Sequence, residues 1–505
     1  MIPPCILMYI TDNNKNIKTF VRYILYFIIA SLFGVALGYS FDDDGLRHLA
    51  FANNFEIMKN WGTVYPHSLF GSYDPWRFWH HFLHFIISIS SFEHAHIVVN
   101  IISLFVLMVL MDSILNLELK KYKNTIVLFV SILSILVYAR YTNLRPDLLS
   151  GFFVLSLYYF SERYKNYKHV TFVLFFIALL YAPMYYLFFV YTLMFAMYFF
   201  MTSQYKNLFA MLFATVIGLT YYYCFFGKES LEIIKYVLID EKLRDGMMVG
   251  EGRPLFGIIG YIGTLAWIIV YSAIMIYLKA KRFSFLKHDR LLTLISVASL
   301  LWIGQMRYYA LFLPLFYLYG VILIVNMDVK QLDKVIQSIK YLYVAVRRTF
   351  IKNNRNISFI LIFSLFIGFE YAQVLHSQNK EIGMQNSKMV KFFKDKRFNN
   401  STILINTLEP IGYYALYANP TIHEIPSCSI GWSNGSKHFN TLYKKLLKKN
   451  ITIKEFSEFV QSVKPDYIFL KLPVSKDQSF TYKKLSKYGF SIVEIFDKYL
   501  ILRKK

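Results

Sequence analysis

Charged residues are scarce in this sequence: Asp, Glu, Lys and Arg make up 17% of its 505 residues, whereas 56% are hydrophobic and 19% aromatic. Soluble domains carry about a quarter charged residues. The composition therefore excludes an ordinary soluble protein and indicates a chain that lies mostly in lipid. The net charge of +24 would suggest nucleic acid in a soluble protein. Here the basic residues lie in short clusters between apolar runs, which argues against nucleic acid as a partner.

Cysteine is also scarce. Cys5, Cys224 and Cys428 are far apart, and the sequence contains no CxxC and no Cys/His spacing typical of a metal site. A disulfide framework or a thiolate zinc site is therefore not expected. Internal repeats and low-complexity segments are absent as well.

Long apolar runs are abundant. A helix needs about 20 residues to cross about 30 Å of hydrocarbon, and runs near this length predict about eleven transmembrane helices. The first run resembles a signal peptide, but the runs that follow it favour an uncleaved anchor. The predicted spans are 19–38, 92–112, 125–139, 146–160, 170–182, 184–201, 207–226, 255–278, 290–305, 308–326 and 356–375.

Basic residues predict the orientation of these spans, because cytoplasmic loops are enriched in Lys and Arg. Most of the Lys and Arg before residue 376 fall in alternate loops that share one side with the N-terminus. We therefore expect a cytoplasmic N-terminus, with the loop 39–91 and everything after residue 375 on the extracytoplasmic side. Low Gly and Pro usage with much Lys, Ile and Asn is typical of an AT-rich genome and favours a bacterial inner membrane.

Two domains are expected. Residues 1–375 form a transmembrane catalytic domain, and residues 376–505 form a small α/β domain outside the membrane. In the second domain "STILINT", "DYIFLKL", "FSIVEIF" and "YLILRK" predict strands, and "SKHFNTLYKKLLKKN" and "IKEFSEFVQSVK" predict amphipathic helices. The fold class is thus mainly α, a polytopic membrane protein with a small sheet domain.

Three consecutive aspartates, Asp42, Asp43 and Asp44, end the first apolar run. One of them can cap the helix predicted to begin near Leu46, but capping does not require three carboxylates that repel one another. The other interpretation is a site at the membrane surface, where one carboxylate acts as a general base or two hold a divalent metal ion.

At four places the sequence resembles the GT-C superfamily of integral-membrane glycosyltransferases. They are "DDDGLRHLAFANNFEIMKNWG" from Asp42, "NLRPDLLSGFFVLSLYYF" from Asn143, "QMRYYALFLPLFYLYG" from Gln305 and the tail with "KPDYIFLKL". The resemblance implies Asp44 as the catalytic aspartate and Asp43 as the next candidate. Gly45 stands where several of the families place Glu, and the Trp-Trp-Asp motif of oligosaccharyl transferases is absent, which argues against transfer of whole oligosaccharides to protein.

The resemblance also implies a sugar donor carried on polyprenyl phosphate in the membrane lipid, and a glycan, lipid or protein as acceptor. Arg145, Arg307 and Arg253 are the candidates to bind the donor phosphate, because an arginine beside an apolar wall suits that group. The implied reaction is an inverting displacement. The acceptor hydroxyl, deprotonated by aspartate, attacks the anomeric carbon while the lipid phosphate leaves.

Further candidates lie between residues 48 and 96, where most of the histidines fall. His80 and His84 are four residues apart and would share one helix face, a spacing that can bind a metal, although neutral histidines also suit an interfacial aromatic belt. Asp42 and Asp74 are secondary acidic candidates. Asp74 is followed by Pro75, and an Asp-Pro pair is commonly only a turn.

Two other functions compete with the transferase. A transporter or flippase for lipid-linked glycans usually shows inverted repeats, which this sequence lacks. A polysaccharide polymerase or ligase has its large loop between late spans, whereas here the first loop is the elaborate one.

Overall fold

The computed structural model describes part of the chain in detail. The described residues are 4–36, 45–53, 74, 76–92, 94–118, 147–227, 289–304, 315, 317–320, 322, 388–405, 415, 418–419, 421–425, 442, 445, 452–471, 486, 489–496 and 499–504.

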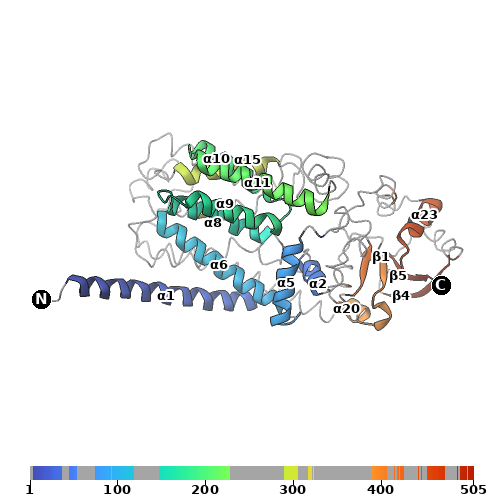
Figure 1. Ribbon diagram of the computed structural model, residues 1–505. Coiled ribbons are helices and arrows are strands. Elements are labelled where there is room, and N and C mark those ends of the chain that lie inside the picture. Colours follow the sequence, from blue (N-terminus) through green and yellow to red (C-terminus); the bar gives the residue numbers. More distant parts are fainter. Residues whose placement is uncertain are drawn as a thin grey trace, which may run out of the picture.

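A bundle of apolar helices forms the larger part of the molecule (Figure 1). The long helix α1, Pro4–Ala36, packs along α6, Ala95–Glu118. The two approach closely at Gly34, where an added Cβ would lie 2.5 Å from Ile101 Cγ1. Glycine therefore permits the contact between these two backbones.

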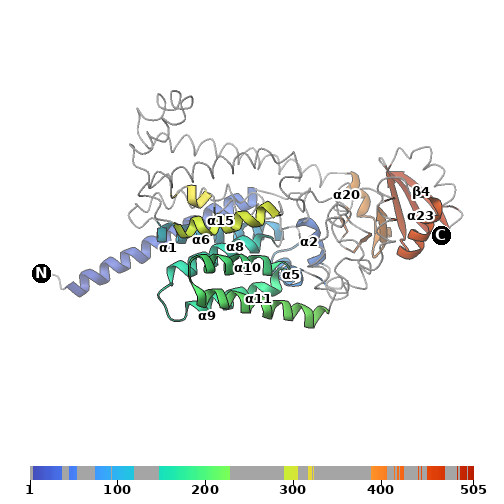
Figure 2. The same ribbon diagram turned by 90° about the horizontal axis from the view of Figure 1, so that it is seen from above.

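The remaining bundle helices closely follow the predicted apolar runs. The 3₁₀ turn η2, Ala182–Met184, separates α9 from α10, and both helices pack against α11 (Figure 2). The Thr171 hydroxyl donates to Asn207 Oδ1 near the starts of α9 and α11, and the Tyr222 hydroxyl donates to the Ala182 carbonyl near their ends. The helices are α8 (Asp147–Arg163), α9 (Val170–Tyr181), α10 (Phe188–Met201), α11 (Tyr205–Phe226) and α15 (Asp289–Gly304).

Two shorter helices lie at the end of the bundle that faces the sheet (Figure 1). Helix α2 spans Gly45–Asn53 and α5 spans Arg77–Ile89. They pack against each other through Leu49 and Phe51 of α2 and Trp79, Leu83 and Ile86 of α5, all buried. This amphipathic pair confirms the helix predicted to begin near Leu46.

The C-terminal part forms a mixed five-stranded sheet in the order β2-β1-β3-β5-β4. Strand β1 is parallel to β2 and β3, and β5 is antiparallel to β3 and β4. The strands are β1 (Thr402–Ile405), β2 (His423–Ile425), β3 (Tyr467–Lys471), β4 (Phe490–Phe496) and β5 (Tyr499–Lys504).

Short helices cover both faces of this sheet. Helix α23, Ile453–Val463, packs Phe456 and Phe459 against one face, and on the other the α20 and η8 residues Phe393 and Phe398 meet Phe469. Helix α20 spans Lys388–Phe393 and η8 spans Lys396–Phe398. All four predicted strands and the second predicted helix are confirmed, whereas β2 was not predicted.

Membrane character is evident in the described helices. By length and composition, α6 (24 residues) and α11 (22 residues) can each cross a membrane, and three shorter apolar stretches accompany them, Thr19–Val35, Val170–Met184 and Phe188–Met201. Large apolar side chains such as Phe20, Phe172 and Phe213 are exposed on the bundle, as expected of helices that face lipid. The fold is thus mainly helical with a small sheet; the predicted count of eleven spans extends over residues outside the described set.

Candidate functional site

A buried chain of hydrogen bonds joins α2 to α5 at the end of the bundle that faces the sheet. His80 Nδ1 lies 2.5 Å from Asp74 Oδ2, and His80 Nε2 lies 2.8 Å from His48 Nδ1. The exposed fractions are 3% for Asp74, 0% for His80 and 2% for His48. A carboxylate and two imidazoles are thus held together out of contact with solvent.

Asp74 also organises the start of α5. Its Oδ1 accepts the backbone N–H of Trp76 at 2.9 Å, and its backbone carbonyl accepts the N–H of Arg77 at 3.3 Å. Asp74 therefore does more than begin a turn, because its other carboxylate oxygen bonds His80 six residues later.

Aromatic rings enclose this chain and connect it to the segment between α9 and α10. The His48 ring meets Trp76 edge-on at 5.0 Å, Phe51 meets His80 at 5.8 Å, and Trp76 meets Tyr186 at 6.1 Å between ring centroids. Edge-to-face packing of this kind fixes the mutual orientation of the rings. The hydrogen-bond chain is thus held between α2, α5 and the loop between α9 and α10.

The histidines of α5 have separate partners. His84 Nδ1 donates to the Ala52 carbonyl at 2.8 Å, so His84, like His80, faces α2, as the four-residue spacing predicts. Within the described part of the chain, no group of three or more His, Cys, Asp or Glu side chains is arranged to hold a metal ion. Partial burial, and then the Arg77 guanidinium, lower the pKa of His81.

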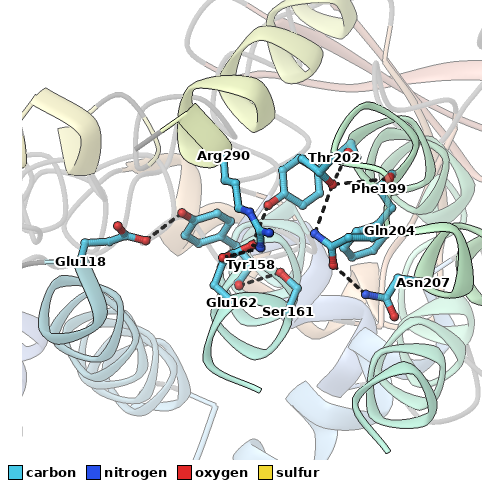
Figure 3. Close-up of polar contacts among 10 residues, drawn as sticks. Glu118, Tyr158, Ser161, Glu162, Phe199, Thr202, Gln204, Asn207 and Arg290 are labelled. Atoms are coloured by element: carbon cyan, nitrogen blue, oxygen red, sulfur yellow. Dashed lines mark hydrogen bonds and ion pairs between the residues drawn. The ribbon is translucent and has the colours of Figure 1, made fainter. Parts of the chain in front are cut away.

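Partly buried charged side chains at the opposite end of the bundle have partners within the protein (Figure 3). Glu162 accepts from Arg290 at 2.8 and 2.9 Å and from Tyr198 at 3.1 Å, and Glu118 accepts from the Tyr158 hydroxyl at 2.9 Å. These contacts connect α6, α8, α10 and α15. Because the charges are matched and join helices, this cluster is suited to holding the bundle together.

Between α1 and α6 a second buried carboxylate is matched in the same way. Asp112 is paired with Arg22 at 3.1 Å and accepts from the Tyr26 hydroxyl at 2.8 Å and from the Asn116 amide at 3.0 Å. All of these donors belong to the two helices that the carboxylate joins.

Only some of the predicted site residues fall in the described part of the chain. Asp74 and His80 are brought together and His84 lies one turn away, whereas Asp42, Asp43, Asp44, Arg145, Arg253 and Arg307 lie outside the described residues. The sequence connects the two sets, because Asp44 directly precedes Gly45, the first residue of α2.

His48 is a site residue to which the sequence assigned no role. The signal for it was present in the concentration of histidines in the first loop and in its position four residues after Asp44. Its partner, however, is 32 residues away on another helix.

Comparison with known proteins gives the fold. No family model matches the chain, and no curated protein sequence matches it. Two solved structures resemble it across most of its length. One is the oligosaccharyltransferase of Archaeoglobus fulgidus, tethered to an acceptor peptide with an NVT sequon, with a TM-score of 0.51, 12% identity, and coverage of 93% of this chain and 72% of that one.

The other is ArnT from Cupriavidus metallidurans, bound to undecaprenyl phosphate, with a TM-score of 0.55, 10% identity, and coverage of 96% of this chain and 98% of that one. At these identities the comparison establishes the architecture alone, so the chain shares the fold of these two structures.

Proposed function

We propose that this protein is a glycosyltransferase of the inner membrane of a bacterium that moves a sugar from a polyprenyl-phosphate donor to an acceptor on the extracytoplasmic face. The observation that carries the proposal is the likeness to ArnT over 96% of this chain and 98% of the other, because that structure holds undecaprenyl phosphate. The fold provides many apolar helix faces on which a polyprenyl tail can lie.

In the proposed reaction the acceptor oxygen forms a bond to the anomeric carbon of the donor. The bond between that carbon and the phosphate oxygen breaks, and the proton of the acceptor passes to Asp44 or, as second candidate, Asp43. Single displacement inverts the anomeric configuration. Arg145, Arg307 and Arg253 are proposed to stabilise the charge that grows on the leaving phosphate.

The arrangement of the described elements supports a site at the end of the bundle where α2 and α5 lie. Helix α2 begins directly after Asp44, and the sheet domain stands at the same end (Figure 1). With a cytoplasmic N-terminus and a multi-pass chain, this end faces outward, where nucleotide sugars are absent and a lipid-borne donor is required.

Substitution of the aspartates tests the proposal. Asp43→Asn and Asp44→Asn are compared with Asp395→Asn, whose carboxylate is exposed in the sheet domain, by mass spectrometry of surface glycans and glycolipids. Positioned base catalysis contributes about 10²–10⁴-fold, so one variant should lose a single sugar while protein level and fold are retained. The mass that disappears identifies the substrate class.

The opposite result is equally clear. If both folded aspartate variants leave every glycan unchanged, the carboxylates serve as caps and the transferase proposal is wrong. A transporter or flippase for lipid-linked glycans then becomes the leading function, with a polymerase or ligase next.

A further inference from the structure

We propose that Asp74, His80 and His48 form a positioning relay that fixes the first turn of α2, and through it the aspartates that directly precede this helix. The inference rests on the proposed function for its catalytic consequence. Its structural part concerns the described residues alone and is tested separately.

Burial shows that the relay is more than a means of docking the two helices. Removing a carboxylate from water is costly unless hydrogen bonds replace its hydration, and apolar side chains would join α2 to α5 at less cost. Leu49 and Phe51 on α2 already pack against Leu83 on α5. A buried Asp-His-His chain beside this contact therefore indicates a requirement for orientation.

With an ionised Asp74 and a neutral His80, the hydrogen bonds have one consistent direction. An ionised Asp74 only accepts, so His80 Nδ1 carries the proton that it donates. In a neutral His80 the second nitrogen, Nε2, is then the acceptor, and His48 Nδ1 must donate to it. The carboxylate thus selects the tautomer of both rings, which is the role of the aspartate in a Ser-His-Asp triad.

The position of His48 connects these hydrogen bonds to the start of α2. His48 is the fourth residue of the helix, about 4.5 Å along the axis from Gly45 at 1.5 Å per residue. It is clamped by His80 from one direction and by the edge-on Trp76 ring from another. Catalytic groups must be held within about 0.5 Å of their working positions, and a first turn fixed at His48 limits where a carboxylate at residue 44 can lie.

His84 provides a matched control for the relay. It lies one turn beyond His80 on the same face of α5 and also bonds α2, but through the Ala52 carbonyl near the far end of that helix. Replacing His80 or His84 with glutamine therefore removes one imidazole hydrogen bond between the same two helices. Only the His80→Gln change interrupts the path from Asp74 to His48.

The first measurement is hydrogen exchange of the α2 amides in the full-length protein in lipid nanodiscs. His80→Gln and Asp74→Asn should increase exchange in the first turn around His48, whereas His84→Gln should increase it mainly near Ala52. If all three variants loosen α2 uniformly, the relay is ordinary helix docking and the inference is overturned. This readout does not depend on transferase activity.

The second measurement is transfer kinetics with purified protein. Because a 1 Å misplacement can cost about 10²-fold, Asp74→Asn should lower kcat by about 10–100-fold with little change in KM, and His84→Gln by less than about threefold. Equal losses of kcat for His80→Gln and His84→Gln would contradict a positioning role.

Two substitutions at His48 separate positioning from direct contact with substrate. Asn places an N–H donor where His48 Nδ1 stands and lacks a group at the Nε2 position, so His48→Asn should retain most of kcat. Gln places its amide farther out, so His48→Gln should lose the relay contact and activity. The reverse order would overturn the proposal, because the distal nitrogen would then be the group that acts.

These outcomes are distinct from a failure of the proposed function. If Asp43→Asn and Asp44→Asn leave all glycans unchanged while the exchange pattern is as expected, the transferase proposal fails and the relay as a positioning device for α2 stands. If the aspartate variants abolish transfer and the exchange pattern is uniform, the relay alone is wrong.

Discussion

The ion pair between α1 and α6 should show strong energetic coupling. The Asp112 side chain is 1% exposed and that of Arg22 is 14% exposed, so both charges have lost most of their hydration. Arg22→Leu leaves the carboxylate without its counter-ion, and removing one partner of a buried pair costs about 3–5 kcal/mol. The hydrogen bonds from Tyr26 and Asn116 remain, so the free energy of unfolding should fall by about 3 kcal/mol, the low end of this range.

The double variant Arg22→Leu/Asp112→Leu should recover most of that loss, because apolar replacement of both partners of a buried pair is often neutral or stabilising. The free energy of unfolding in a mixed-detergent series measures all variants of the cycle. Ser31→Ala is the matched control, since this hydroxyl on α1 donates to the Phe27 carbonyl of its own helix, and the change should cost under about 0.5 kcal/mol. If the two single losses simply add in the double variant, the pair is not coupled and the reasoning is refuted.

Three further outcomes are expected. Gly34→Ala should destabilise the protein by about 1–3 kcal/mol, because the new Cβ meets Ile101; no loss in the detergent series would mean that α1 and α6 do not approach there. Asn100→Leu should stabilise by about 1–3 kcal/mol, because both amide atoms are buried without a hydrogen-bond partner; a destabilised variant would contradict this. Lys445 lowers the pKa of Glu455 to about 2, from 4.5. The stability that this ion pair gives should be complete above about pH 4.5 and lost as pH falls towards 2. The loss should appear as faster exchange of the α23 amides after correction for intrinsic rates. Glu455→Gln should not show this pH dependence.

The sequence predicts the transmembrane elements well where an apolar run fills the helix. The runs 170–182 and 290–305 agree with α9 and α15 to within about a residue. The run 19–38 agrees with the apolar stretch Thr19–Val35, and the helix that contains this stretch, α1, begins earlier, at Pro4. The polar stretch "TDNNKN" within this helix has no apolar periodicity. A helical segment outside the hydrocarbon does not need this periodicity, so the apolar pattern does not mark it.

In the sheet domain, strands with several β-branched or aromatic residues were predicted, whereas β2 was not. Strand β2 is the three-residue segment "HEI" at the sheet edge, and it is held by its parallel pairing with β1. So short a strand is determined by its neighbour, which makes it a tertiary feature that local sequence does not encode.

The candidate site was predictable only in part, for a similar reason. The four-residue spacing predicts correctly that His80 and His84 share a face, since that rule concerns one helix. The contacts of His80 with Asp74 and His48 depend on how the turn before α5 folds and where α2 docks. Neither is encoded in a local spacing, so the spacing of the histidines did not predict this hydrogen-bond chain.

The partners of two buried carboxylates distinguish a structural from a functional role. Asp112 receives its bonds from a guanidinium, a phenol and an amide on α1 and α6, the helices it joins. Arginine donates and cannot accept, so Arg22 passes on no order beyond its ion pair with Asp112. Asp74 instead faces an imidazole, which donates with one nitrogen and accepts with the other, and the order it imposes passes through His80 to His48. A carboxylate whose partner can fix the orientation of a side chain on a neighbouring helix is suited to positioning a site. This property makes Asp74, and not Asp112, the better candidate for a positioning role.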